Sequence, residues 1–373
     1  MAAGQTAARV LEFDDAWDWM EQAYKNGWTD GLPVAPPTEE RVRAMVEYVR
    51  RKPDELLGLI PPLQGKATVE KVAIQAVMAG CAPEHFPVVL AALECMLCEQ
   101  DKEHFNLKGV QDTTNPVTPL VIVSGPAVKQ LGFHYKENAF GGFSRANAAV
   151  GRAVRLILWN LGAARPGQTD MTHLGHPGKY SFCVAENPDP EENPWTKLNI
   201  EWGYPASQST VTVFGCEAPR NVLTLTAVGR EGNPGPERAL RFIARAMATP
   251  GSNNYHFMGQ VLVTFGPRTV AHLHQAKYTK ETVRRFLFDQ ARNRLGDLIR
   301  DGLYNPSVGN DTWRDYAPWV DQTSPDTMVP IVEREENILI TVTGGMSLPW
   351  NSVCHGWGNF GAYAVTRPIT FPK

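Results

Sequence analysis

Residues 170–187 gather the side chains that acid–base chemistry needs. This segment holds two acids, two histidines, a lysine and a thiol within 18 positions. Glu186 or Asp170 could act as a general base, with Lys179 or a histidine as the acid or electrostatic stabiliser. The alternative is a polar loop whose side chains cap turns and pair with one another.

The same segment offers ligands for a divalent transition metal. Asp170, His173 and His176, with Glu186 as a fourth group, combine the imidazole and carboxylate ligands that suit zinc, iron, manganese or nickel. The His-x-x-His spacing lies in a loop rich in Gly and Pro, where it is less specific than two histidines one turn apart on a helix.

Two cysteines are candidate nucleophiles. Cys183 lies within the polar segment, and Cys216 follows an expected strand after one glycine. Cys95 and Cys98 form a C-x-x-C pair inside an apolar helix, where buried thiols are usually inert. The six cysteines follow no disulfide framework, which indicates a reduced, cytoplasmic protein.

The glycine-rich segment 140–152 is a candidate anion-binding site. Gly141 and Gly142 allow a ligand to approach the backbone, and the helix that follows begins with free N–H groups. Arg145 and Arg152 add donors that suit a carboxylate or phosphate. The glycine spacing matches neither a P-loop nor a dinucleotide fingerprint, and an ordinary helix cap is the alternative. The candidate substrate ligands are Gly141, Gly142, Ser144, Arg145, Asn147 and Asn187.

Alternating helices and strands are expected to position these residues. Hydrophobic periodicity and capping residues predict a mixed α/β or α+β fold. Helices are expected at 14–26, 38–51, 69–80, 83–99, 144–161, 236–247, 269–275 and 279–293. Strands are expected at 117–124, 209–214, 222–228, 260–264 and 337–343.

A weak internal repeat suggests two interlocked and duplicated halves. In Leu120–Val128 and in Val261–Val270 an apolar strand is followed by Gly-Pro and a helix start, and the two Gly-Pro pairs lie 266 − 125 = 141 residues apart. The alternative is that no repeat exists, because Gly-Pro commonly follows a strand. We expect an N-terminal helical arm with a Pro-rich loop (1–60), a first half with the candidate site (61–205) and a second half with a Gly-rich tail (206–373). A cleft between the halves would be the default ligand site.

Composition excludes several classes of protein. The net charge is −3 and the basic residues are dispersed, so neither nucleic acid nor an anionic membrane is required as a partner. No apolar run approaches the roughly 20 residues of a membrane helix, and residues 1–10 carry no secretory signal. The Pro-rich arm that ends at Pro37 could pack across the other half or a neighbouring subunit, which favours a homo- or hetero-oligomer.

Three motifs resemble those of a largely uncharacterised bacterial family. They are GWTDGLPV at 27–34, GGFSRAN at 141–147, and PGKY at 177–180 with Glu186-Asn187. The resemblance implies an association with small proteins that carry a Cys- or selenocysteine-Gly-Ser-Cys motif, and hence thiol or redox chemistry that needs a partner protein. It implies no role for individual residues.

Together these patterns favour an enzyme that acts on a small anionic organic molecule. Acid–base or thiol-linked chemistry would make it a lyase, a hydrolase or hydratase, or a redox enzyme. One alternative is a metal-dependent enzyme that uses Asp170, His173 and His176. The other is a non-catalytic subunit that positions a separate catalytic partner.

Overall fold

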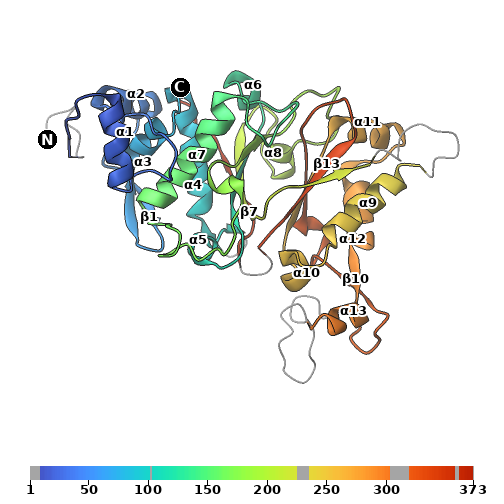
Figure 1. Cartoon of the computed structure of the whole chain (residues 1–373). Coiled ribbons are helices and arrows are strands. Elements are labelled where there is room, and N and C mark those ends of the chain that lie inside the picture. Colours follow the sequence, from blue (N-terminus) through green and yellow to red (C-terminus); the bar gives the residue numbers. More distant parts are fainter. Residues whose placement is uncertain (1–8, 101–102, 225–234, 303–318, 358–360, 373) are drawn as a thin grey trace.

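Two four-stranded mixed sheets with helices on their outer faces form the fold (Figure 1). The computed structural model describes residues 9–100, 103–224, 235–302, 319–357 and 361–372. The expected α/β or α+β class is confirmed. Within these ranges no helix combines the length and the apolar character needed to cross a bilayer.

The first sheet has the strand order β14-β7-β5-β6. At its centre, β5 (Thr118–Ser124) runs parallel to β6 (Cys183–Ala185) and antiparallel to β7 (Thr210–Cys216). The outer edge of β7 pairs with β14 (Val365–Pro368). Every residue of β5 is buried, which explains the continuous apolar run of this strand in the sequence.

The second sheet repeats this arrangement with the order β12-β9-β13-β8. Here β9 (Val261–Phe265) runs parallel to β12 (Ile338–Val342) and antiparallel to β13 (Trp350–His355). The outer edge of β13 pairs with β8 (Arg220–Leu223). The rest of the strand expected at 222–228 lies outside the described residues after position 224.

The two sheets exchange their last strands. β8 follows β7 in the chain but joins the second sheet, whereas β14 follows β13 but joins the first. The central strands β5 and β9 lead through Gly-Pro into α6 (Ala127–Gln130) and α11 (Pro267–Gln275), as the repeated motif predicts. Residues 206–373 therefore supply β7 and β14 to the first sheet, and the halves are interlocked by covalent crossings.

Helices cover the outer face of each sheet, and a third apolar cluster lies between the sheets. The first sheet carries α4 (Phe86–Met96) and α7 (Arg145–Asn160), and α3 (Val69–Met78) packs on these two helices. The second carries α9 (Glu237–Met247) and α12 (Lys280–Gln290). Side chains of both sheets meet in the cluster between them, which joins Leu120 and Ile122 to Leu262 and Leu339.

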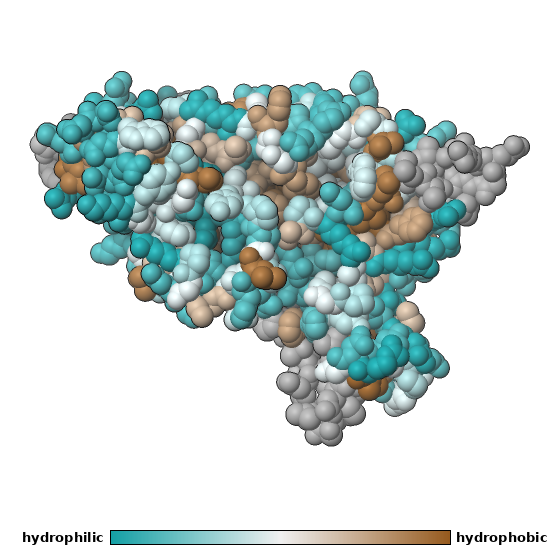
Figure 2. Space-filling model, in the orientation of Figure 1, coloured by the Kyte–Doolittle hydropathy of each residue, from teal (hydrophilic) through white to brown (hydrophobic). Residues whose placement is uncertain are grey.

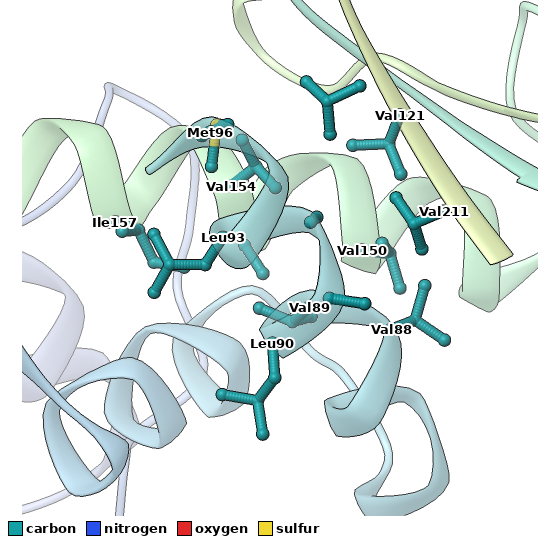
Figure 3. Close-up of a cluster of buried hydrophobic side chains, with 14 of the residues drawn as sticks. Val88, Val89, Leu90, Leu93, Met96, Val121, Val150, Val154, Ile157 and Val211 are labelled. Carbon is teal, nitrogen blue, oxygen red and sulfur yellow. The ribbon is translucent and has the colours of Figure 1, made fainter. Parts of the chain in front are cut away.

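Helix α4 lies at the centre of the first half. Its side chains pack against α7 on one side and against β5 and β7 on the other, so nearly the whole helix is buried (Figure 3). This confirms the expectation from its continuous apolar sequence. Each fully buried Leu or Val contributes about 1.5–3 kcal/mol relative to exposure. Cys95 and Cys98 are part of this core, as predicted.

The N-terminal arm packs on the first half. It comprises α1 (Ala16–Lys25), α2 (Glu39–Val49) and the loop between them. Helix α7 fixes that loop, because Trp159 Nε1 donates to Gly27 O at 2.8 Å and Arg152 pairs with Asp30 at 2.7 Å. The alternative in which the arm crosses onto the other half is therefore wrong.

Shorter elements connect these layers. They are β1 (Leu56–Ile60), β2 (Gly65–Thr68), β3 (Glu99–Gln100), β4 (Glu103–His104), α5 (Leu107–Asp112), α8 (Leu198–Glu201), α10 (Asn253–Phe257), β10 (Arg292–Arg294), α13 (Leu295–Arg300) and β11 (Met328–Pro330). On the face shown in Figure 2, apolar side chains form small separate patches among polar ones.

Candidate functional site

A cavity of about 310 Å³ lies between the halves, where the parallel strands β9 and β12 end. The second half supplies most of its lining, and residues 137–141 of the first half close it. We call it the seam cavity. Carboxyl ends of strands and contacts between domains are common places for small-molecule sites. Its lining comprises Glu137, Asn138, Ala139, Phe140, Gly141, Asn221, Thr264, Gly266, Thr343, Gly344, Gly345, Ser347, Leu348, Trp350, Asn351 and Ser352.

A row of polar residues crosses the second sheet at this cavity. Thr341, Thr264, Ser352 and Asn221 are direct register neighbours on β12, β9, β13 and β8. Register neighbours point to the same face of a sheet. This is the face toward the first sheet, because residues two positions away on β9, β12 and β13 belong to the cluster between the sheets.

Three hydroxyl groups in this row have no hydrogen-bond partner among the described residues. Thr341, Thr264 and Ser352 are at most 3% exposed, and their Oγ atoms are buried. A buried polar group without a partner costs about 1–3 kcal/mol. Thr264 and Ser352 also contribute atoms to the lining of the seam cavity, so rotation about their Cα–Cβ bonds could bring either hydroxyl to a ligand there.

Glu137 faces the turn that follows β12. A methyl group on Gly345 would lie 2.8 Å from the Glu137 carboxylate, and Gly344 has a φ of +106°. Two glycines therefore let the turn pass close to this acid. Glu137 has the one titratable side chain among the described residues that line the cavity, so it is the candidate for proton transfer there.

The start of α7 holds the loop that carries Glu137. Asn147 Oδ1 accepts from His134 N at 2.8 Å, and Asn147 Nδ2 donates to His134 O at 3.1 Å. His134 Nε2 in turn reaches Glu137 O at 2.5 Å, and Ser144 caps the helix through Asn147 N. Of the predicted substrate ligands, Gly141 lines the cavity, whereas Ser144 and Asn147 support its wall.

The predicted cluster of arginines at this helix start does not form. Arg145 Nε donates to Gly80 O at 2.7 Å. Arg152 is engaged by Asp30 and by the carbonyl oxygens of Leu32 and Pro33. Gly142 adopts a φ of +71° in the turn before the cap. The two arginines therefore tie α7 to neighbouring segments.

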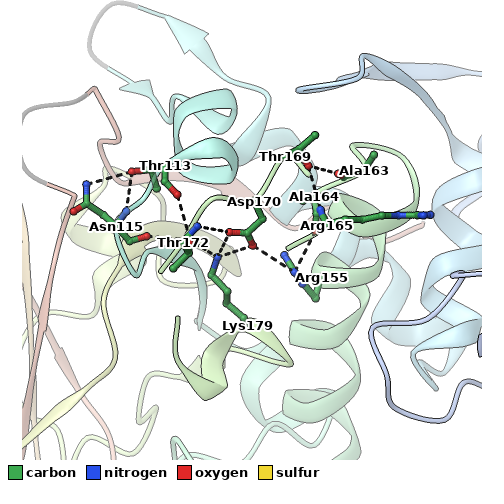
Figure 4. Close-up of polar contacts among 10 residues, drawn as sticks. All are labelled: Thr113, Asn115, Arg155, Ala163, Ala164, Arg165, Thr169, Asp170, Thr172 and Lys179. Carbon is green, nitrogen blue, oxygen red and sulfur yellow. Dashed lines mark hydrogen bonds and ion pairs between the residues drawn. The ribbon is translucent and has the colours of Figure 1, made fainter. Parts of the chain in front are cut away.

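The predicted acid–base pair Asp170 and Lys179 forms a buried ion pair (Figure 4). Lys179 Nζ lies 2.7 Å from Asp170 Oδ2 and 2.7 Å from Thr172 Oγ1, and Arg155 lies 3.6 Å from the same carboxylate. Burial opposes ionisation of Asp170, but the Lys179 hydrogen bond and charge hold its pKa below the ordinary value. This geometry supports a structural role, and neither residue lines the seam cavity.

The two histidines do not join Asp170 in a cluster. His176 Nδ1 accepts from Gly178 N at 3.1 Å, and burial lowers the pKa of this imidazole. His173 donates its backbone N–H to Thr114 O. Within the described ranges no group of three or more His, Cys, Asp or Glu side chains could hold a metal. A divalent metal stays a prediction.

Both candidate thiols are buried. Cys183 packs in the core beside α7, and Cys216 lies in the cluster between the sheets next to Cys354. Burial raises the pKa of both thiols well above the ordinary value, which favours the protonated form. Neither lines the seam cavity.

Glu186 lies buried at the end of the first sheet. It follows β6 and contacts the Ser124 hydroxyl at the end of β5, while Leu198 N donates to it at 2.8 Å. It is 2% exposed, its Oε1 has no partner among the described residues, and burial raises the pKa of its carboxyl. Asn187 N donates to Val342 O at 2.7 Å, so this residue joins the two halves.

Comparisons with known proteins add no family. No protein-family model matches the chain, and no curated protein sequence matches it. The candidate site therefore rests on its geometry.

No pattern in the sequence indicated Glu137, Thr264 or Ser352. Thr264 lies in the strand that the repeated Gly-Pro motif predicts, but a hydroxyl in a strand is ordinary for Thr. The useful signals were the expected cleft between the halves and the paired glycines after β12. They indicate where a site could form, but not its side chains.

Removing the unpartnered hydroxyls should stabilise the free protein. Thr264→Val and Ser352→Ala are each expected to raise the free energy of unfolding in urea by about 1 kcal/mol, because a buried polar group without a partner disappears. Thr212→Val is the control, since the Thr212 hydroxyl contacts Thr366 Oγ1 at 2.8 Å and its loss should destabilise. Destabilisation by all three changes would show that the cavity hydroxyls are satisfied in solution.

Breaking the Asp170–Lys179 ion pair should destabilise the folded protein strongly, and the loss of stability should depend on pH. Asp170→Asn is expected to lower the free energy of unfolding at pH 7 by about 3–5 kcal/mol, because buried cations lose their partner. The folded-state pKa is depressed, so this stability is present above about pH 4 and is lost as pH falls through the folded value. Urea unfolding should show that the difference in free energy of unfolding between wild type and variant decreases as the pH is lowered from 7 to 3.

The exposed pair Lys108–Asp112 provides the control for this experiment. Asp112→Asn should cost about 0.5 kcal/mol or less, since an exposed pair four residues apart on a helix contributes little. A cost for Asp170→Asn as small as that of Asp112→Asn would contradict the structural role.

Proposed function

We propose that the protein is an enzyme that binds a small polar molecule in the seam cavity and transfers a proton through Glu137. The observation that carries this proposal is the pair of neighbouring buried hydroxyls, Thr264 and Ser352, that line the cavity without a partner. An unsatisfied buried polar group in a natural protein calls for an explanation, and a catalytic or ligand-binding role is one such explanation.

The lining favours a substrate without negative charge. Among the described lining residues Glu137 is acidic and none is a Lys, Arg or His, so an anion would meet repulsion and no counterion. Hydroxyl and amide side chains suit a molecule that carries hydroxyl or amide groups itself. Our proposal therefore replaces the anionic substrate expected from the sequence with an uncharged, hydrogen-bonding one.

A single carboxylate favours proton-transfer chemistry. Glu137 could accept a proton from a substrate hydroxyl or carbon and return it to a leaving group, as in a lyase, hydratase or hydrolase. Thiol-linked chemistry within this chain has less support, because Cys183 and Cys216 lie in apolar cores away from the cavity.

A non-catalytic role beside a partner protein is the second candidate. Leu348 and Trp350 line the cavity and are 46% and 47% exposed, so apolar surface surrounds a polar interior. A partner could dock there and insert a polar group. Copurification with a stoichiometric partner, and turnover only in its presence, would favour this role.

Exchange of Glu137 tests the enzyme directly. Uncharged polyols, amides and amino alcohols would first be screened by thermal shift, and binders would be followed for turnover by NMR. Glu137→Gln is expected to lower kcat by about 10²–10⁴-fold with little change in substrate affinity, because the amide keeps the shape but cannot accept a proton.

Glu191→Gln is the matched control, since Glu191 is an exposed acid outside the cavity. It should retain the wild-type kcat. If Glu137→Gln turns over a confirmed substrate as fast as this control, Glu137 is not the catalytic residue.

A further inference from the structure

A second, larger cavity of about 750 Å³ lies at the other end of the first half. It is enclosed by α1, α2, α3, the end of α7 and residues 9–13 of the arm, and we call it the arm cavity. Figure 1 shows α1 and α3 at the end of the molecule away from β13. None of its lining residues is shared with the seam cavity.

Aromatic side chains form the apolar part of the arm cavity. Trp19 and Trp28 stack with ring centroids 5.9 Å apart, and Phe13 meets Trp19 edge-on at 5.3 Å. Ile74 and Met78 of α3 extend this surface. Trp19 is fixed by its indole N–H, which donates to Val34 O at 2.9 Å, so the aromatic wall is rigid.

Hydrogen-bond donors gather at the other side of the arm cavity. Asn160 Nδ2 donates to Gln75 Oε1 at 2.8 Å and to Trp28 O at 2.9 Å, which fixes the Gln75 amide. With Oε1 engaged by Asn160, Nε2 is the atom of the Gln75 amide that is left to donate to a ligand in the cavity. Arg165 Nη2 donates to Gly27 O at 3.2 Å, but its buried Nε has no partner in the described chain.

The charges at this donor side favour an anion. Three cations, Arg9, Lys71 and Arg165, line the cavity with two acids, Glu39 and Glu70, and none of the described ion pairs involves Lys71 or Arg165. Glu70 lies in the same wall, but it is buried and already engaged in an interaction of its own. An acceptor group on a ligand would meet Gln75 Nε2 and Arg165 together.

We propose that the arm cavity binds an amphipathic carboxylate, with its apolar chain or ring on Trp19 and Trp28 and its carboxylate at Gln75 and Arg165. The volume is in the range of small-molecule sites, which is roughly 300–1,000 Å³. Burial of apolar surface supplies affinity, and the unpartnered donors orient the head group. This site is independent of the proposed reaction in the seam cavity.

Decanoate is the probe that tests this site on the full chain. Titration calorimetry and quenching of tryptophan fluorescence should show one saturable site per chain. Decanamide, which lacks the charge, should bind at least about tenfold more weakly, since a charge-assisted pair contributes about 1.5–3 kcal/mol. Equal affinity for the two probes, or the absence of saturable binding of decanoate, would overturn the proposal.

Two variants locate the probe. Gln75→Leu should weaken decanoate binding about tenfold by removing a head-group donor, and Ile74→Phe should reduce it further by filling the cavity. Circular dichroism would verify the fold of both, and Arg165→Lys gives a milder third change at the head group. Gln290→Leu, an exposed change on α12, should bind like wild type.

The test of decanoate binding in the arm cavity is independent of the test of catalysis in the seam cavity. Glu137→Gln should bind decanoate with wild-type affinity, because Glu137 is not part of the arm cavity. Binding that Gln75→Leu and Ile74→Phe leave unchanged would place decanoate elsewhere and refute this site.

Discussion

The exchange of the last strand between the two sheets is the constraint on which the rest of the structure depends. Residues 206–373 hold all four strands of the second sheet and also supply β7 and β14 to the first, so the first sheet is incomplete without the second half. The inner faces must then meet, and alternate residues of each central strand become core between the sheets. The seam cavity lies at the polar end of that shared interface. The location of the candidate site therefore follows from the strand topology.

The polar residues at the ends of the two sheets have different surroundings. At the end of the first sheet, the Glu186 carboxylate contacts Ser124 and α8 covers it. At the end of the second sheet, Thr264 and Ser352 stand at a cavity with their hydroxyls unpartnered. The end of the first sheet is therefore closed by an internal acid, whereas the end of the second lies at a cavity.

Local patterns in the sequence predicted much of the fold but little of the candidate site. The apolar run of β5, the buried helix α4 and the Ser144 cap of α7 depend on neighbours in the chain, and all three are present. Asp170 and Lys179 also looked catalytic because polar residues cluster around them. Their contact is instead a buried ion pair with Arg155 at its side, which is a tertiary property that spacing does not show.

The roles of Arg152 and of the cavity residues also depend on tertiary contacts that spacing in the sequence does not show. Arg152 pairs with Asp30, 122 residues away, so its role as a clamp on the arm could not be predicted from its place near a helix start. Glu137 meets Gly345 across the interface between the halves, and this contact depends on the strand exchange. The repeated Gly-Pro motif was the one local signal of that arrangement.

Ligand binding at the seam cavity can be tested by soaking crystals of the protein with a cocktail of small polyols and amides. We expect a bound molecule in the seam cavity with polar atoms about 3 Å from Thr264 Oγ1 and Ser352 Oγ, facing Glu137. Cocktail molecules that bind at other places, with both hydroxyls left without a partner, would contradict it.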